Sequence, residues 1–263
     1  MHWTRRRVVL AALGGLIAVA GVAAPLAGAL DPVRTGSDTR VVLPSGRAYV
    51  LHTPPLLRRT PALAEGRPAM IFLHGLGDDP AAAASSTGFD RLSDRDGDLI
   101  AYPEGVRRSF NAGLCCGPAV PLGVDDVGFL SDVVSDLRAR GAGRVAVVGF
   151  SNGGMMAYRL ACARPDLVDT VGVMSGTLEI PHCDGPIKAL ALHGASDHSV
   201  PFTGSHYSSY LQCFLRDVRT IQGAAPGSSI TIRELPGFAH RWTVAKDKVN
   251  ATREFWDFAG MRG

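Results

Sequence analysis

A serine near the middle of the chain has the sequence context of a nucleophile. Gly149-Phe150-Ser151-Asn152-Gly153 fits the pattern G-x-S-x-G and follows 144–148, which is expected to be a buried strand. In this pattern the serine lies on a sharp turn between a strand and a helix, and glycines two positions away leave room for it. The alternative is a glycine-rich turn whose serine only caps a helix. The strand, turn and helix order favours a nucleophile at Ser151.

A serine hydroxyl becomes an effective nucleophile when a neighbouring base takes its proton. Hydrolases whose nucleophile lies on such a strand-to-helix turn carry their three catalytic residues in the chain order serine, acid, histidine. His240 follows the last expected strand and precedes the last expected helix, so we predict that it is the base. His198 is the reserve candidate, and His193, which ends a strand as His-Gly, is expected to support a turn.

Asp197 is the predicted acid. It lies in the loop after the expected strand 187–192 and is the only carboxylate between Asp184 and Asp217. A carboxylate at this position holds the histidine in the required tautomer and stabilises the imidazolium that forms. The alternative is a residue that only caps the loop.

Acyl transfer also needs hydrogen-bond donors for the developing oxyanion. One donor is expected to be the backbone N–H of Asn152, the residue after the nucleophile. The second is expected from the loop that follows the strand 69–73, where Leu76 lies between two glycines. His74 in the same loop is expected to be structural.

This chemistry proceeds through an acyl-enzyme and requires neither a cofactor nor a metal. The chain has no C-x-x-C pair, which argues against a zinc site. Four aromatic residues near the expected strand ends are candidates to line the substrate site, although each is more often part of a core: Tyr102, Phe110, Phe202 and Trp242.

The elements expected to position these residues alternate between strands and helices. The expected strands are a pair over 39–53, then 69–73, 99–102, 144–150, 168–174, 187–192 and 230–235; the expected helices are 126–138, 153–163, 205–215 and 250–258; 54–67 and 106–123 are expected loops. Apolar strands alternating with helices predict an α/β fold in three layers, a mostly parallel sheet with helices on both faces. Active sites of such sheets lie at the carboxyl ends of the strands.

The first 29 residues are predicted to be an export signal. Arg5-Arg6-Arg7 precedes an uncharged apolar run, and Ala27-Gly28-Ala29 is a small-x-small cleavage site. The arginines are compatible with a Sec or a twin-arginine signal. The alternative is an uncleaved membrane anchor. Residues 30–263 are then the catalytic domain, secreted, periplasmic or in the cell envelope.

The charge balance excludes one class of partner. The chain has 27 Lys and Arg against 24 Asp and Glu, and without the three leader arginines the two counts are equal. No basic stripe with interleaved aromatics occurs, so we expect no nucleic-acid partner. No cysteine precedes Cys115, so no lipid anchor is expected near the leader. The expected partner is a small-molecule or polymeric substrate, and the oligomeric state is left open.

Five cysteines are disulfide candidates in an exported protein. Because a bridge between neighbours strains the bond geometry, Cys115 and Cys116 are expected to bond to two different partners. At least one of the five thiols must be left over. The alternative is that all five are buried free thiols.

Several segments together resemble a known group of esterases. They are SFNAGLCCGPAV (109–120), VDDVGFLSDVV (124–134), GFSNGGMMAYRLAC (149–162), HGASDHSVPFTG (193–204) and a C-terminal H-x-W before NATREFWDF. This combination is similar to the polyhydroxybutyrate depolymerase, feruloyl esterase and acetylxylan esterase group, which includes LpqC-type esterases. The resemblance covers most of residues 40–260.

The resemblance implies an α/β-hydrolase fold, carboxylic-ester hydrolysis, secretion, and a triad of Ser151, Asp197 and His240. It also implies that the Cys115-Cys116 loop packs near the active site, with Cys162 and Cys183 as its disulfide partners. Two positions differ from the group: Phe110 stands where tryptophan is common, and Arg241 follows the histidine.

The predicted function is therefore a secreted serine esterase acting on short-chain, feruloyl, acetyl or polyhydroxyalkanoate-type esters. A serine peptidase on the same fold is one alternative. A non-catalytic cell-surface binding protein is another, although all three triad residue types are present.

Overall fold

The computed structural model describes residues 35–208, 211, 213–244 and 249–261. The predicted export signal, residues 1–29, lies outside the described residues. Within the described part of the chain, each helix falls short of the length and apolar character needed to cross a bilayer.

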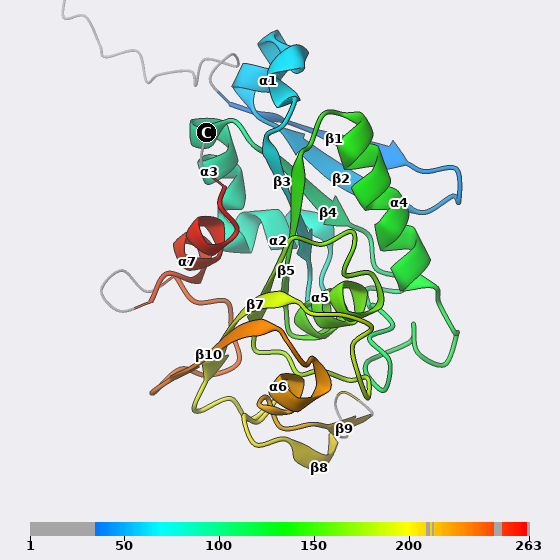
Figure 1. The fold of residues 1–263 in the computed structure, drawn as a ribbon, viewed down its shortest axis with the longest axis vertical. Helices are drawn as coiled ribbons and strands as arrows, with labels where there is room; N and C mark the ends of the chain where they lie inside the picture. Colours follow the sequence, from blue (N-terminus) through cyan, green and yellow to red (C-terminus); the bar gives the residue numbers. More distant parts are fainter. Residues whose placement is uncertain (1–34, 209–210, 212, 245–248, 262–263) are drawn as a thin grey trace, which may run out of the picture. The chain divides into compact units, whose positions relative to one another are not determined.

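An eight-stranded sheet forms the centre of the domain, in the order β1-β2-β4-β3-β5-β6-β7-β10 (Figure 1). From β4 to β10 all neighbours are parallel, and β2 pairs antiparallel with both β1 and β4. The strands are β1 (Ser37–Val42), β2 (Ala48–Thr53), β3 (Pro68–Leu73), β4 (Leu99–Pro103), β5 (Arg144–Phe150), β6 (Thr170–Met174), β7 (Lys188–Gly194) and β10 (Ser229–Leu235). The predicted mostly parallel sheet is confirmed.

Strand β3 shows how the sheet is buried on both faces. Its residues alternate: Ala69, Ile71 and Leu73 join one apolar core, and Met70 and Phe72 join the other. Successive side chains of a strand point to opposite faces, so a strand covered on both sides is apolar throughout. The continuous apolar run in the sequence therefore follows from helices on both faces.

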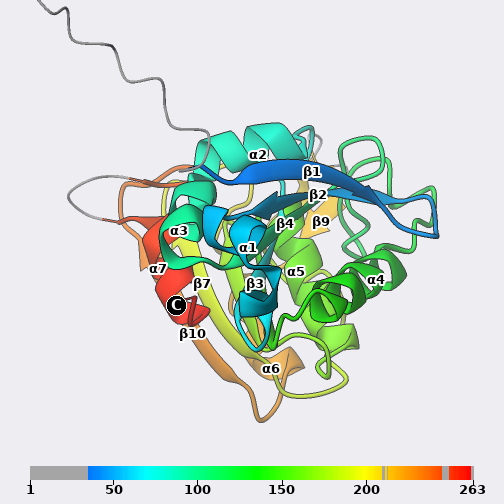
Figure 2. The same cartoon turned by 90° about the horizontal axis from the view of Figure 1, so that it is seen from above.

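The helices form the two outer layers (Figure 2). One face carries the long helices α4 and α5, and the other carries α2, α3 and α7. The helices are α1 (Pro55–Arg59), the 3-10 helix η1 (Pro61–Ala64), α2 (Pro80–Thr87), α3 (Phe89–Asp96), α4 (Asp126–Ala139), α5 (Asn152–Ala163), α6 (Thr220–Ala224) and α7 (Ala251–Phe258). The predicted three-layer α/β architecture is confirmed.

Side-chain caps define where several helices begin. Asp125 accepts a hydrogen bond from the backbone N–H of Gly128 at the start of α4, 2.8 Å away. Asn250 does the same for Arg253 at the start of α7. These bonds satisfy N–H groups that have no partner within the helix. The predicted helices 126–138 and 250–258 therefore agree with the structure to within a residue.

The helix predicted over 205–215 is wrong. This segment contains β8 (Ser205–Ser208) and β9 (Cys213–Leu215), which pair antiparallel. The rings of Tyr207 and Phe214 meet in an edge contact, with centroids 5.4 Å apart. Cross-strand aromatic pairs stabilise sheets, and the segment is poor in strong helix formers.

The loop predicted over 54–67 is also wrong in part, because it contains α1 and η1. Each of these short helices has proline in its first turn. Proline is tolerated there, since the N–H that it lacks would have no intrahelical partner.

Candidate active site

The turn around Ser151 has the geometry of a nucleophile elbow. Ser151 lies between β5 and α5 and has a backbone φ of 54° and ψ of −122°. This is an unusual conformation for a residue with a side chain. A Cβ atom on Gly153 would lie 2.1 Å from the carbonyl oxygen of Leu73, and one on Gly149 would lie 2.3 Å from that of Gly153. Glycine is therefore required on both sides of the serine.

The structure brings Ser151, His240 and Asp197 together from three separate loops. His240 Nε2 lies 3.0 Å from Ser151 Oγ, and His240 Nδ1 lies 2.7 Å from Asp197 Oδ2. The three residues follow β5, β10 and β7, whose carboxyl ends meet at one edge of the sheet. Because a carboxylate only accepts hydrogen bonds, Nδ1 carries the proton and Nε2 faces the serine hydroxyl.

The surroundings of Asp197 keep it ionised. Burial by itself would raise the pKa of Asp197, but hydrogen bonds from His240 and the backbone N–H of Val200 outweigh it and lower that pKa. Its other oxygen accepts from the backbone N–H groups of Ser199 at 3.0 Å and Val200 at 2.8 Å. These two bonds fix the carboxylate in position, so it can orient the imidazole and stabilise its charged form.

A cavity of about 250 Å³ opens beside the hydroxyl of Ser151. It is lined by Gly75, Leu76, Gly77, Asp78, Phe150, Ser151 and His240. Leu76, the predicted second oxyanion donor, therefore lines this cavity. Asn152 is the first residue of α5, where a backbone N–H has no intrahelical acceptor.

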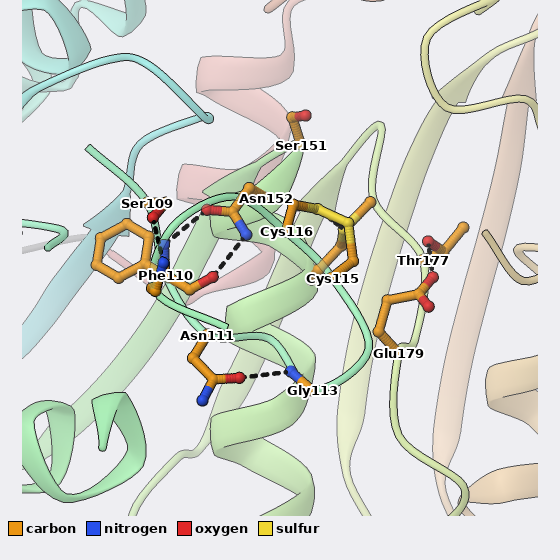
Figure 3. The surroundings of a disulfide bond; sticks show 12 residues. Ser109, Phe110, Asn111, Gly113, Cys115, Cys116, Ser151, Asn152, Thr177 and Glu179 are labelled. Atoms are coloured by element: carbon orange, nitrogen blue, oxygen red, sulfur yellow. Dashed lines mark hydrogen bonds between the residues drawn. A yellow bond between two sulfur atoms is a disulfide. The ribbon is translucent and has the colours of Figure 1, made fainter. Parts of the chain in front are cut away.

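Two features of this site were missed by sequence reasoning. The first is Phe150, whose ring centroid lies 4.9 Å from that of His240. The only feature of the sequence that could have placed Phe150 at the site is its position directly before Ser151. The second is the side chain of Asn152, which bonds to the backbone of Phe110 and anchors the loop 104–125 beside the site (Figure 3).

The four aromatic residues proposed to line the substrate site are not among the residues that line this cavity. Phe110 and Tyr102 are buried: Phe110 packs on His74, and the Tyr102 hydroxyl donates to Asp90. Those two predictions are wrong, because core packing and a buried hydrogen bond use both rings.

Trp242 and Phe202 are half-buried but are directed elsewhere. Trp242 packs against Phe72 and donates from Nε1 to Thr252 Oγ1 at 3.0 Å. Phe202 contacts the ring of His193 and the guanidinium of Arg219.

The expectation that Cys115 and Cys116 bond to different partners is wrong. They form a disulfide with each other, and Cys162 bonds to Cys183 (Figure 3). Cys116 Sγ contacts Met155 Sδ at 3.4 Å, and Cys162 lies two turns further along the same helix, about 10 Å away. The loop therefore meets α5 too far from Cys162 for a bond. Cys213 is a buried free thiol.

Other histidines have structural surroundings. His193 Nε2 lies 2.7 Å from the carbonyl oxygen of Val200, as expected for a residue that supports a turn. His74 Nδ1 lies 2.8 Å from the carbonyl oxygen of Gly75, and its Nε2 accepts from the N–H of Gly105. Burial lowers the pKa of both rings. The reserve base, His198, is exposed.

Two groups of potential metal ligands occur among the described residues, and neither includes a triad residue. In one, Cys115 and Cys116 are bonded to each other beside Cys213. In the other, the ring nitrogens of His52 already contact Asp38 and Asp94.

Comparison with known proteins finds relatives named as esterases. A protein of Nocardia uniformis subsp. tsuyamanensis named "Putative esterase NocK" is 37% identical over 185 residues, which cover 66% of this chain and 52% of that protein. Feruloyl esterase C of Emericella nidulans is 42% identical over 87 residues, 30% of this chain and 32% of that protein. The chain thus spans about half of the length of the first of these relatives and about a third of the second. No family model matches the chain.

Comparison of folds gives the same architecture. The acetyl xylan esterase of Aspergillus awamori superposes with a TM-score of 0.60 over 86% of this chain and 100% of that one, at 15% sequence identity. Such low identity supports the fold alone. The chain has the α/β-hydrolase fold, and its sequence relatives are proteins that carry the names of esterases.

Proposed function

We propose that this protein is a serine carboxylic-ester hydrolase with Ser151 as nucleophile, His240 as base and Asp197 as the acid that orients it. The observation that carries the proposal is the pair of short contacts at His240, 3.0 Å to Ser151 Oγ and 2.7 Å to Asp197 Oδ2. A nucleophile within hydrogen-bond reach of an oriented base is the arrangement that acyl transfer needs. The esterase names of the relatives favour an ester over an amide.

The first step forms an acyl-enzyme. His240 Nε2 takes the proton of Ser151 as Oγ attacks the ester carbonyl carbon. The carbonyl oxygen becomes an oxyanion, which accepts hydrogen bonds from the backbone N–H groups of Leu76 and Asn152. The imidazolium then gives its proton to the alcohol oxygen as the carbon–oxygen bond breaks, and the alcohol leaves.

The second step releases the acid. Water takes the place of the alcohol, gives a proton to His240 and attacks the acyl carbon, and the same two N–H groups hold the new oxyanion. Ser151 leaves with the proton from His240, and the free enzyme is restored. The ionised Asp197 stabilises the imidazolium in both steps, and no cofactor takes part.

The substrate class is part of the proposal. Acetyl and feruloyl esters fit the names of relatives called acetylxylan esterase and feruloyl esterase. Short-chain and polyhydroxyalkanoate-type esters are proposed from the resemblance of the sequence segments alone. We also propose that residues 1–29 are an export signal and that residues 30–263 are the catalytic domain, which acts outside the cytoplasm as a secreted or cell-envelope protein.

Hydrolysis of p-nitrophenyl acetate, p-nitrophenyl butyrate and methyl ferulate by the purified protein tests the function. Wild type should turn over at least one of these esters, and Ser151→Ala should lose at least about a thousandfold in kcat. Ser135→Ala is a matched control, because Ser135 lies on the exposed side of α4. If Ser151→Ala keeps wild-type turnover, the nucleophile assignment is wrong. If wild type cleaves a dipeptidyl p-nitroanilide but no ester, the protein is a peptidase, and if it cleaves neither, the binding-protein alternative stands.

A further inference from the structure

A second cavity lies beside the catalytic one. It has a volume of about 310 Å³, within the range of small-molecule sites. Among the residues that the structure describes, its lining contains no charged side chain and consists of Leu114, Cys116, Gly117, Val120, Pro121 and Leu211. Because the Cys116 sulfur is bonded to Cys115, it cannot ionise. We call these six residues the apolar cavity.

The apolar cavity and the catalytic cavity are adjacent at Leu76 and Gly117. Leu76 lines the catalytic cavity, and Gly117 lines the apolar cavity. A Cβ atom built on Gly117 would lie only 2.5 Å from Leu76 Cδ1, so the backbone of Gly117 packs directly on the Leu76 side chain. The residue proposed to supply an oxyanion donor therefore also forms the wall between the two cavities.

The loop that carries the apolar cavity is held in place. The N–H of Leu114 donates to the carbonyl oxygen of Glu179 at 3.1 Å, and the N–H of Ala119 donates to Ser109 Oγ at 3.0 Å. Cys116 contacts Met155 on α5, the helix that follows Ser151. Figure 3 shows the disulfide next to Asn152, below Ser151. A cavity formed in advance can bind a ligand without the cost of ordering its walls.

The acyl chain and the alcohol group of the bound ester must extend from Ser151 in different directions. His240 has to reach the alcohol oxygen to protonate it, so the alcohol lies on the His240 side. His240 contacts Phe150, which packs against the core on the α7 face of the sheet. Leu76, Cys116 and Leu211 belong to the core on the opposite face, with α4 and α5. An acyl group that extends from Ser151 away from His240 would therefore point toward that face.

We propose that the apolar cavity binds the uncharged acyl group of the substrate. This inference rests on the proposed function. Burial of a carboxylate among these residues without a partner is costly, so the cavity selects medium-length alkyl or aryl acyl groups over charged ones. An acetyl group carries only one methyl carbon beyond the carbonyl, so we expect it to gain the least from the cavity.

The test fills the cavity. Val120 is half-buried, and Val120→Trp puts a large ring into the space without a change in charge. We expect the ratio of kcat/KM for p-nitrophenyl octanoate to that for p-nitrophenyl acetate to fall at least tenfold. Leu122→Trp is the matched control, since Leu122 is 52% exposed on the same loop and does not line the cavity. This control should keep the wild-type ratio.

A second variant tests the proposal independently in case Val120→Trp does not fold. Leu114 is 59% exposed at the cavity, so Leu114→Asp adds a charge there with little effect on the core. Leu114→Asp should also lower the ratio of kcat/KM for p-nitrophenyl octanoate to that for p-nitrophenyl acetate. The proposal is overturned if both variants keep the wild-type ratio, if Leu122→Trp lowers it equally, or if wild type hydrolyses acetate but not octanoate.

A pair of alkyl esters separates the acyl side from the alcohol side. In Val120→Trp, turnover of methyl octanoate relative to methyl acetate should fall, while turnover of octyl acetate relative to methyl acetate should stay as in wild type. The opposite result places the alcohol in the cavity and overturns the proposal. Failure of the proposed function looks different, because wild type would then hydrolyse none of these esters.

Discussion

The side-chain amide of Asn152 forms two hydrogen bonds with the backbone of one residue, Phe110. Oδ1 accepts from the Phe110 N–H and Nδ2 donates to the Phe110 carbonyl oxygen, both at 2.8 Å and both buried. Asn152 thus has two roles in the proposed site: its backbone N–H serves the oxyanion, and its side chain holds the loop that carries the disulfide. Neither donor nor acceptor on Phe110 is left unsatisfied.

Asn152→Ala should separate these two roles. The buried N–H and carbonyl oxygen of Phe110 would lose their partners, so we expect the free energy of unfolding to fall by about 2 to 3 kcal/mol. The backbone N–H of residue 152 remains, so kcat should fall far less than in Ser151→Ala. Urea denaturation and ester kinetics measure the two effects. An unchanged unfolding midpoint would show that the tie to Phe110 contributes nothing to stability.

Asp197→Asn should remove activity and leave the fold intact. The asparagine oxygen can still accept from the backbone N–H groups of Ser199 and Val200, which now bond to Asp197 Oδ1. Its amide N–H₂ would face His240 Nδ1 and favour the wrong tautomer, and this costs on the order of 10⁴ in kcat. Steady-state kinetics beside thermal melting test the prediction. Activity within tenfold of wild type would exclude Asp197 as the orienting acid.

His52 should make stability depend on pH. Its Nδ1 lies 2.7 Å from Asp38 and its Nε2 lies 3.0 Å from Asp94, and Tyr102 donates to the nearby Asp90. Burial would lower the pKa of His52, but the carboxylates of Asp90, Asp38 and Asp94 outweigh it and raise that pKa above 6.5. The folded state therefore holds the proton more tightly than the unfolded state. The stabilisation is complete below the unfolded value and is lost as the pH rises through the folded value.

Comparison of His52→Gln with wild type measures this effect. Two hydrogen bonds between a charged ring and carboxylates, one of them to the exposed Asp38, suggest a difference of about 2 kcal/mol near pH 6. The difference should be smaller at about pH 8.5, because the folded protein loses this charge as the pH rises through the raised pKa of His52. Chemical denaturation at the two pH values measures the free energy of unfolding of wild type and of His52→Gln. A difference that grows with pH would contradict the assignment of a charged His52.

Cys213 should be unreactive in the folded protein. It is a buried thiol, and burial together with the nearby Glu179 carboxylate raises its pKa to about 12. The thiolate is the reactive form, so almost none is present near pH 8. Ellman's reagent should therefore find no thiol in the native protein and one thiol in guanidinium. Cys213→Ser, with no thiol in either condition, identifies the residue that reacts, and rapid labelling of the native protein would refute the prediction.

The sequence by itself determined the order and type of the main elements. The runs 69–73 and 145–150 are apolar at every position because strands covered on both faces have no polar side. The motif around Ser151 was recognisable for a local reason: a strand-to-helix turn this tight excludes side chains at positions 149 and 153. Chain order then pointed to Asp197 and His240, which the fold brings within hydrogen-bond distance.

Only the tertiary structure decided how the loops fill the space around that framework. The partner of Cys116 depended on where its loop meets α5, and the burial of Phe110 and Tyr102 depended on residues such as His74 and Asp90, which are 36 and 12 positions away. The antiparallel pairing of β8 with β9 depends on contacts between the two strands, which helical periodicity does not reveal. Local propensity and spacing are properties of neighbours in the chain, whereas packing, disulfide choice and cavity walls arise from contacts between distant segments.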